Sequence, residues 1–196
     1  MTLRSLAVAV VLLFAIALSA QNAGIDLLRN IHDPLPRKAD QPLRIVSGSV
    51  LPMMIAVPIG IGVYNYATTK SLTQNKEHFT VAGSVILSGT IIMGLKYAID
   101  RPRPFVTYND IAQKDQHVGP YSFPSGHTAQ AFALATSVSL CYPKWYVIAP
   151  SFAWAFTVGF SRMWLGVHYP GDVLTGAVIG TASAFGTYYF MQWISR

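Results

Sequence analysis

Residues 79–95 read FTVAGSVILSGTIIMGL, and this stretch sets the class of fold. It contains no Asp, Glu, Lys or Arg, and it mixes branched aliphatic residues with Gly, Ala and Ser. A helix that crosses the hydrocarbon of a bilayer needs about 20 mostly apolar residues. Small residues let such helices pack closely where hydrophobicity cannot hold them together. The stretch therefore predicts a membrane-spanning helix.

Five further stretches also lack charged side chains. They are residues 5–25, 45–69, 118–143, 145–161 and 173–195. The sequence thus predicts an all-α fold, a polytopic membrane helix bundle with six transmembrane helices in one domain over residues 1–196. Pro52 and Pro58 lack the amide hydrogen that a helix interior uses, so we expect a kink in the second helix.

The overall composition agrees with a membrane protein and excludes other classes. The chain of 196 residues is 52% hydrophobic and only 11% charged, whereas soluble domains carry about 25% charge. Lys and Arg number 14 against 8 Asp and Glu, but the surplus comes from few acids rather than basic runs, so no nucleic-acid partner is expected. The single cysteine, Cys141, excludes an intramolecular disulfide and a Cys-rich zinc site.

The amino-terminal segment has two interpretations. Residues 1–4 form a short positive start, residues 6–18 are apolar, and residues 19–21 are a candidate cleavage site. Residues 1–25 are therefore either a first transmembrane helix or a signal peptide, and cleavage would leave five spans. Residues 26–44 are polar and read as an extramembrane connector with room for a short interfacial helix.

The order of spans places several helix ends on one face. The third span ends near Lys96, the fourth begins near Gly126, the fifth ends near Ser161 and the sixth begins near Asp172. Loop Lys and Arg counts do not settle the orientation, because the candidate site itself holds several of them. The positively charged amino terminus is expected to stay on the inner side of the membrane, which places this face outside. We expect a multi-pass protein of the inner (cytoplasmic) membrane whose site faces the periplasm.

Three clusters lie on that face, and the first is KYAIDRPRP at residues 96–104. Snorkelling Lys and Arg followed by helix-ending prolines explain this cluster well when it is taken alone.

The second cluster is FPSGH at residues 123–127, followed by an apolar helical run. Ser125 is suited to cap that helix, with Gly126 and His127 in the first turn. The backbone amides and the positive helix end there would attract an anion. A plain Ser cap beside an interfacial His explains the same residues equally well.

The third cluster runs from Ser161-Arg162 through His168 to Asp172. Asp172 can accept a hydrogen bond from the His168 ring, which would fix the tautomer and leave the other ring nitrogen free as a nucleophile or base. The alternative is a structural hydrogen-bonded pair. Because all three clusters fall on one face, coincidence is the poorer explanation.

Together these clusters resemble the signature of the type 2 phosphatidic acid phosphatase family. The matching elements are the spacing from Lys96 to Pro104, the tetrad at residues 124–127, and the pattern of Ser161-Arg162, His168 and Asp172. The family includes membrane lipid phosphatases and, more distantly, soluble acid phosphatases and vanadium haloperoxidases. Every signature position is filled, which makes residues 96–172 the signature-bearing catalytic region. The resemblance to the six-helix membrane branch favours retention of the first helix.

The resemblance implies a role for each matched residue. His168 would attack phosphorus and form a phosphohistidine, Asp172 would orient it, and His127 would protonate the departing oxygen and then activate water. The residues that would hold the phosphoryl oxygens are Lys96, Arg103, Ser125, Gly126 and Arg162. Arg101 lies inside the first motif without being a signature position; it is a secondary binding candidate that could contact headgroup, lipid phosphate or Asp100.

The predicted charges suit a reaction without metal or cofactor. A phosphomonoester brings about −1.5 to −2 charges, which three fixed cations roughly balance. The sequence has no His-Glu-x-x-His motif and no Asp-rich cluster. His168 must start neutral and His127 charged, so we expect a bell-shaped pH profile.

Outside the motifs, Tyr108, His117 and Tyr121 lie in the connector where headgroup selection is expected, although most loop residues of this kind are only solvated or packed. Trp164 is interpreted as an interfacial anchor.

The predicted function is that of a metal-independent lipid phosphate phosphatase acting on a phosphomonoester or diphosphate of a membrane lipid. The candidate substrates are phosphatidylglycerol phosphate, phosphatidic acid, polyprenyl diphosphate and lipid A. The partners are this phosphorylated lipid and the bilayer, and the sequence does not define the oligomeric state. The alternatives are a non-catalytic lipid or phosphate binder and a vanadate-dependent oxidising enzyme.

Overall fold

The computed structural model describes residues 24–32, 37–71 and 76–194, and these ranges contain helices and no strand. The all-α prediction is confirmed for them. The predicted first transmembrane helix or signal peptide, residues 1–25, lies almost wholly outside the described residues.

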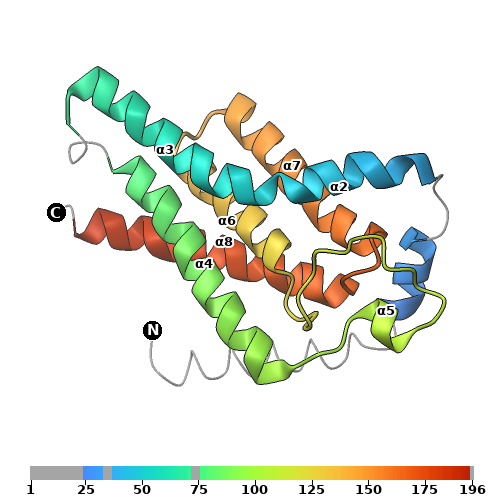
Figure 1. The fold of residues 1–196 in the computed structure, drawn as a ribbon. Helices are drawn as coiled ribbons and strands as arrows, with labels where there is room; N and C mark the ends of the chain where they lie inside the picture. The colour runs from blue at the N-terminus through green and yellow to red at the C-terminus, as the bar shows by residue number, and fades with distance from the viewer. Residues whose placement is uncertain (1–23, 33–36, 72–75, 195–196) are drawn as a thin grey trace.

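The helices pack around a central one. In chain order the elements are a helix over residues 24–32, η1 (Arg37–Ala39), α2 (Asp40–Gly48), α3 (Val50–Thr69), α4 (Glu77–Ile99), α5 (Pro104–Thr107), α6 (Gly126–Cys141), α7 (Trp145–Trp164) and α8 (Pro170–Trp193). Helix α6 contacts α3, α4, α7 and α8, and Figure 1 shows it in the middle of these helices. The short α5 and the loop after it lie at one end of the bundle, near the start of α8 (Figure 1).

The predicted number of six spans is not confirmed. Among the described residues, two helical segments are long and apolar enough to cross a bilayer, α3 and a segment over Glu77–Thr107 that includes α4. Helix α6 has only 16 residues. At 1.5 Å per residue it is about 24 Å long, whereas the hydrocarbon core is about 30 Å thick.

The boundary between the predicted connector and the second span is also different. Helix α2 starts at Asp40, inside the predicted connector, and continues to Gly48. The helix assignment is interrupted at Ser49, and Pro52 and Pro58 both lie within α3. The kink expected at these prolines stays a prediction. The Ser49 hydroxyl donates to the Val46 carbonyl at 2.7 Å and accepts from the indole of Trp154 at 2.9 Å. These side-chain bonds stabilise the break.

Glycines allow α6 and α8 to touch backbone to backbone. A Cβ atom on Gly180 would lie 2.1 Å from the Ala129 carbonyl oxygen, and one on Gly176 would lie 2.6 Å from that of Ser125. Small residues thus allow close packing at Gly180. At Gly186, in the same helix, a Cβ would meet nothing within 4 Å. The close crossing brings the first turns of α6 and α8 together.

The helix over residues 24–32 covers the same end of the bundle. Its Ile25 and Leu28 pack in one apolar cluster with Ile111 of the connector. The ring of His32 accepts from the Ala112 amide at 3.1 Å and contacts the Trp164 carbonyl at 2.9 Å through Nδ1. Because Nε2 is the acceptor, the proton of the neutral ring lies on Nδ1 and is donated to that carbonyl. This ring therefore ties the connector to the end of α7.

Candidate active site

The three signature clusters meet at one cavity of about 310 Å³. Each comes from a helix end, as the order of spans predicts. The signature residues that line the cavity are Lys96, Arg103, Gly126, His127, Arg162 and His168. No Asp or Glu is among the described residues that line it. The lining thus combines three basic side chains with two signature histidines.

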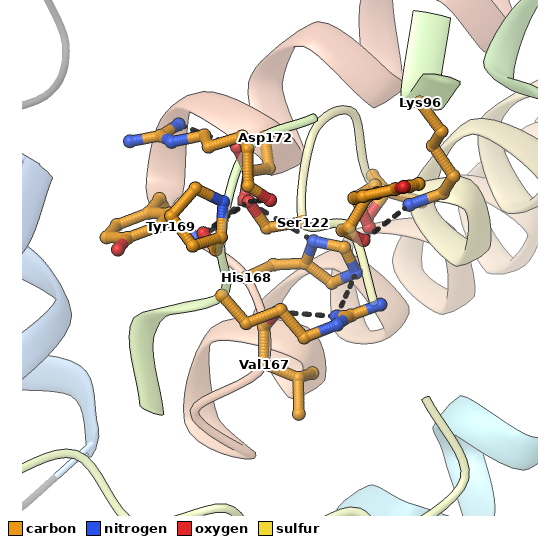
Figure 2. Close-up of polar contacts among 12 residues, drawn as sticks. Lys96, Ser122, Val167, His168, Tyr169 and Asp172 are labelled. Atoms are coloured by element: carbon orange, nitrogen blue, oxygen red, sulfur yellow. Dashed lines mark hydrogen bonds and ion pairs between the residues drawn. The ribbon is translucent and has the colours of Figure 1, made fainter. Parts of the chain in front are cut away.

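His168 lies between a guanidinium and a carboxylate, and it is almost completely buried. Its Nε2 is 3.4 Å from Nη1 of Arg103, and its Nδ1 is 3.4 Å from Oδ2 of Asp172 (Figure 2). The second contact has an ion-pair distance but not hydrogen-bond geometry. Since a guanidinium can only donate, Nε2 must hold its lone pair and the proton lies on Nδ1, facing the carboxylate. This is the tautomer that a nucleophilic Nε2 requires.

The turn before His168 depends on a glycine. Gly166 has a φ of +72°, and a Cβ there would lie 2.5 Å from the carbonyl oxygen of Ala112. A side chain at this position would be strained and would push the connector away. The Lys114 amide donates to the Leu165 carbonyl at 3.1 Å, which adds a second link between turn and connector.

Asp172 is fully buried, and besides its contact with His168 it accepts two hydrogen bonds. Its Oδ1 accepts from Nη1 of Arg101 at 2.7 Å, and its Oδ2 accepts from the Tyr169 amide at 2.9 Å (Figure 2). The Arg101 guanidinium also lies 3.9 Å from the centroid of the Tyr169 ring. Arg101, the secondary binding candidate, is therefore committed to the signature carboxylate rather than to Asp100, and it does not line the cavity. Its charge neutralises Asp172 from behind the nucleophile.

Arg103 and Lys96 are held by backbone carbonyls. Arg103 donates through Nε to Gly119 at 2.6 Å and through Nη1 to Val167 at 2.7 Å (Figure 2). Lys96, in the last turn of α4, donates to the carbonyl of Tyr121 at 2.9 Å (Figure 2). Carbonyl partners fix the two cations without cancelling their charge.

Ser125, Gly126 and His127 begin α6. Ser125 is the N-cap residue, as expected, but its side chain makes no capping bond to the backbone. Its hydroxyl pairs with that of Thr128 at 2.8 Å, and its amide donates to the Asp172 carbonyl at 3.0 Å. Ser125 is fully buried and does not line the cavity, whereas Gly126 and His127 do. The amides of the first helical turn have no partner within their own helix, so they favour an anion here.

The electrostatic environment keeps His168 neutral. Burial lowers the pKa of His168 well below the usual 6.5, and the nearby positive charges of Arg103 and Arg162 lower it further. A neutral imidazole has the free lone pair that attack on phosphorus needs.

The connector residues separate into two groups. His117 and Tyr121 line the cavity. Tyr108 does not: its ring lies edge-on to Tyr169, with centroids 6.4 Å apart, and under the guanidinium of Arg29.

The interpretation of Trp164 as an interfacial anchor is wrong. The side chain is fully buried, its indole donates to Oδ1 of Asp40 at 2.8 Å, and Lys114 Nζ lies 4.1 Å from the ring centroid. The packing of the helix over residues 24–32, of η1 and of α2 over the end of α7, which the sequence did not predict, buries this residue.

Two residues outside the motifs also contact the signature. Asp115 of the connector and Ser47 of α2 both accept from Nη1 of Arg162. Sequence reasoning missed both, and the only available signal was an acid in a chain with few acids.

In the part of the chain that the structure describes, no group of three or more His, Cys, Asp and Glu side chains could hold a metal ion. That the reaction needs no metal stays a prediction.

Comparisons with known proteins agree with the motif assignment. Residues 77–196 match the model of the PAP2 superfamily. The bacitracin transport permease protein BcrC of Bacillus licheniformis is 31% identical over 183 residues, which cover 90% of this chain and 82% of that protein. The undecaprenyl-diphosphatase BcrC of Bacillus subtilis is 34% identical over 114 residues, 58% of each chain. The lipid A 4'-phosphatase of Bacteroides thetaiotaomicron is 36% identical over 101 residues, 49% of this chain and 44% of that protein. The chain therefore spans less than two thirds of the latter two.

Two solved structures share the fold. LpxE of Aquifex aeolicus superposes with a TM-score of 0.71 at 24% identity, covering 85% of this chain and 95% of that one. The first transmembrane PAP2-type phosphatidylglycerolphosphate phosphatase from Bacillus subtilis superposes with a TM-score of 0.76 at 22% identity, covering 95% of both chains.

Proposed function

Since the chain belongs to the PAP2 superfamily, we propose that it is a metal-independent lipid phosphatase that hydrolyses a phosphomonoester or diphosphate of a membrane lipid. The observation that supports this most is the cavity lined by three cations and two signature histidines without a lining carboxylate. Such a lining suits an anion of two negative charges, which is what a phosphomonoester carries at neutral pH.

In the first proposed step, Nε2 of His168 attacks phosphorus while the bond between phosphorus and the leaving oxygen of the lipid breaks, an ester bond in a phosphomonoester and an anhydride bond in a diphosphate. Asp172 faces the Nδ1 proton and stabilises the positive charge that the imidazole gains. His127 donates a proton to the departing lipid oxygen. The negative phosphoryl group beside His127 favours its protonated form.

In the second step, His127 takes a proton from water, and the resulting hydroxide attacks the phosphohistidine. The nitrogen–phosphorus bond breaks, inorganic phosphate leaves, and His168 is neutral again. Lys96, Arg103 and Arg162 stabilise the charge on the transferring group throughout, which is the largest catalytic term expected in phosphoryl transfer.

A lipid substrate is supported by the position of the cavity. Met93 and Tyr97 line it, and they are 56% and 70% exposed on α4. The cavity thus continues to the apolar outer face of a helix that is long enough to span a bilayer. A lipid could enter sideways with its tail still in the membrane.

Polyprenyl diphosphate, lipid A and phosphatidylglycerol phosphate are the leading substrates, because the relatives are named for them. Phosphatidic acid remains a candidate on the motif resemblance alone. We place the protein in the inner membrane of a bacterium with this site on the extracytoplasmic side.

The test is phosphate release from a panel of these lipids by the purified protein and by His168→Ala. The wild type should release phosphate from at least one lipid and His168→Ala from none. Brief incubation with a ³²P-labelled lipid should leave an acid-labile, alkali-stable label on the wild type only. Activity that a chelator abolishes and magnesium restores would contradict the metal-free scheme. Binding of the lipids without release would favour the non-catalytic alternative, and halide oxidation with added vanadate would favour the oxidising one.

A further inference from the structure

Arg162 is the most deeply buried cation of the site, and only one of its terminal nitrogens has protein partners. Its side chain is 1% exposed. Nη1 donates to Oδ2 of Asp115 at 2.8 Å and to the hydroxyl of Ser47. Nε is buried without a hydrogen bond, and Nη2 makes none with any described residue. Asp115 is the only carboxylate within ion-pair distance of Arg162 among the described residues.

The occupied nitrogen determines which edge of the guanidinium is open. Nη1 lies on the same side as Cδ, whereas the N–H groups of Nε and Nη2 point together along the opposite edge. Two parallel N–H groups bind two oxygens of a phosphate or carboxylate at once. Arg162 lines the cavity, and the donors that no described residue occupies are those of this edge, of which Nε is buried.

We propose that Asp115, together with Ser47, is a positioning residue that holds Nη1 of Arg162 and thereby presents the Nε–Nη2 edge to two phosphoryl oxygens. This inference rests on the proposed function, and it adds to the signature a residue that comes from the connector.

The second oxygen of Asp115 also holds the connector segment that lines the cavity. Oδ1 accepts from the backbone amide of His117 at 3.0 Å, and His117 lines the cavity. One carboxylate therefore holds both Arg162 at the base and the connector segment at the side.

Asp115 is also charged in the working range of pH. Burial raises the pKa of its carboxyl, but the His117 amide and the Arg162 guanidinium lower it more, so that the pKa lies below its usual value. A buried guanidinium that lost this partner would keep its charge and would turn toward any other acceptor.

The experiment measures binding of orthovanadate by calorimetry and kcat/KM on the best lipid. Asp115→Asn should weaken vanadate binding and lower kcat/KM by about 10- to 100-fold, because misplaced binding groups cost up to that much. Asp115→Glu keeps the carboxylate and should recover part of the loss. The matched control is Asp110→Asn, which removes a connector acid whose partner is the exposed Arg29 and should change neither quantity by more than about twofold.

A double-mutant cycle separates positioning from a general structural effect. In an Arg162→Lys background, which has no Nε–Nη2 edge to present, Asp115→Asn should change vanadate binding by less than about threefold. A full, additive effect there would overturn the proposal, as would wild-type binding by Asp115→Asn.

Ser47→Ala keeps the test decisive if Asp115→Asn does not fold. It removes only the second partner of Nη1 and should weaken vanadate binding by about threefold to tenfold, within the range of one hydrogen bond to a charged group. Unchanged binding in Ser47→Ala would overturn the proposal. Because vanadate binding is measured without turnover, an inactive wild type would refute the proposed function and leave this test intact.

Discussion

The two ends of the bundle each contain a cavity, and the larger one is not the candidate active site. At the end opposite the signature, a cavity of about 400 Å³ lies between the start of α4 and the ends of α6 and α8. Its lining includes one cation and one acid, Lys76 and Glu77. The signature cavity, of about 310 Å³, has three cations and no lining acid.

The direction of α6 adds to the electrostatic difference between the two cavities. The signature cavity is lined by the first turn of α6, where backbone amides point outward, whereas the opposite cavity is lined by the last turn of α6, where carbonyls do. The charge and direction of the lining, rather than the volume, therefore distinguish an anion site from a gap between helices.

The sharpest test of this difference replaces a carboxylate by an amide at each end of the bundle. Asp172→Asn should lower kcat about 10³- to 10⁴-fold, because the imidazole loses the charge that fixes its tautomer and stabilises its cationic form. Glu77→Gln removes a carboxylate from the opposite cavity. Because this group is remote from the chemistry, kcat should change less than twofold, which is about 0.4 kcal/mol of activation free energy at most. Phosphate release from the best lipid measures both. Comparable losses in the two variants would mean that the ends are not functionally distinct.

A cation exchange tests the geometry of the site. Arg162→Lys should lose most activity, about 10²- to 10³-fold, because the charge stays while the two-pronged donor edge is lost. Its counterpart Lys76→Arg should have little effect on turnover. Full activity of Arg162→Lys would show that this residue does not grip the phosphoryl group.

The pH dependence tests the cationic lining. His168 must be neutral to attack, and its lowered pKa keeps it so until the pH falls well below 6.5. Positive charges, including that of Lys96, contribute to this lowering. Lys96→Gln should therefore raise the pKa of His168 and move the acid limb of kcat/KM to higher pH.

The second ionisation of the substrate phosphate, near pH 6, appears equally in wild type and variant, so the difference between their profiles isolates the protein group. An acid limb that stays in place, or that moves to lower pH, would contradict the assignment of this limb to His168.

The smallest expected effect concerns the backbone contact between α8 at Gly180 and the first turn of α6. Gly180→Ala should destabilise the protein by about 1–3 kcal/mol, because the added methyl group overlaps the Ala129 carbonyl. Gly186→Ala, in the same helix, meets nothing within 4 Å and should be neutral or slightly stabilising. Thermal unfolding in detergent compares the two. Equal midpoints would show that the backbones of α6 and α8 can separate without cost.

The sequence predicted which residues meet at the site better than it predicted the number and lengths of the helices. The alternation of apolar stretches was enough to place Lys96, His127, Arg162 and His168 at one end, because the direction of each helix follows from its order. The lengths of the helices were less predictable, since a charge-free stretch such as residues 118–143 includes loop as well as the shorter α6. The absence of charge alone therefore gives too long a span, although the cap residue Ser125 marks where α6 begins.

Contacts between distant residues explain what the sequence did not reveal. Arg162 meets Ser47 across 115 positions of the chain, and Arg101 meets Asp172 across 71. Neither contact has a spacing that a motif would preserve. Trp164 likewise looked like a membrane anchor because its burial depends on α2, whose packing on α7 is visible only in the fold.

The shortness of α6 has a consequence for the depth of the site. A helix of about 24 Å is shorter than a hydrocarbon layer of about 30 Å. Because α3, α4, α7 and α8 surround α6, its sides contact other helices rather than lipid. With its carboxyl end level with one surface, the amide of Gly126 would lie about 6 Å beneath the opposite headgroups, the depth of roughly one helical turn. A phosphate bound at that amide would thus sit in a recess enclosed by protein, below the level of the headgroups.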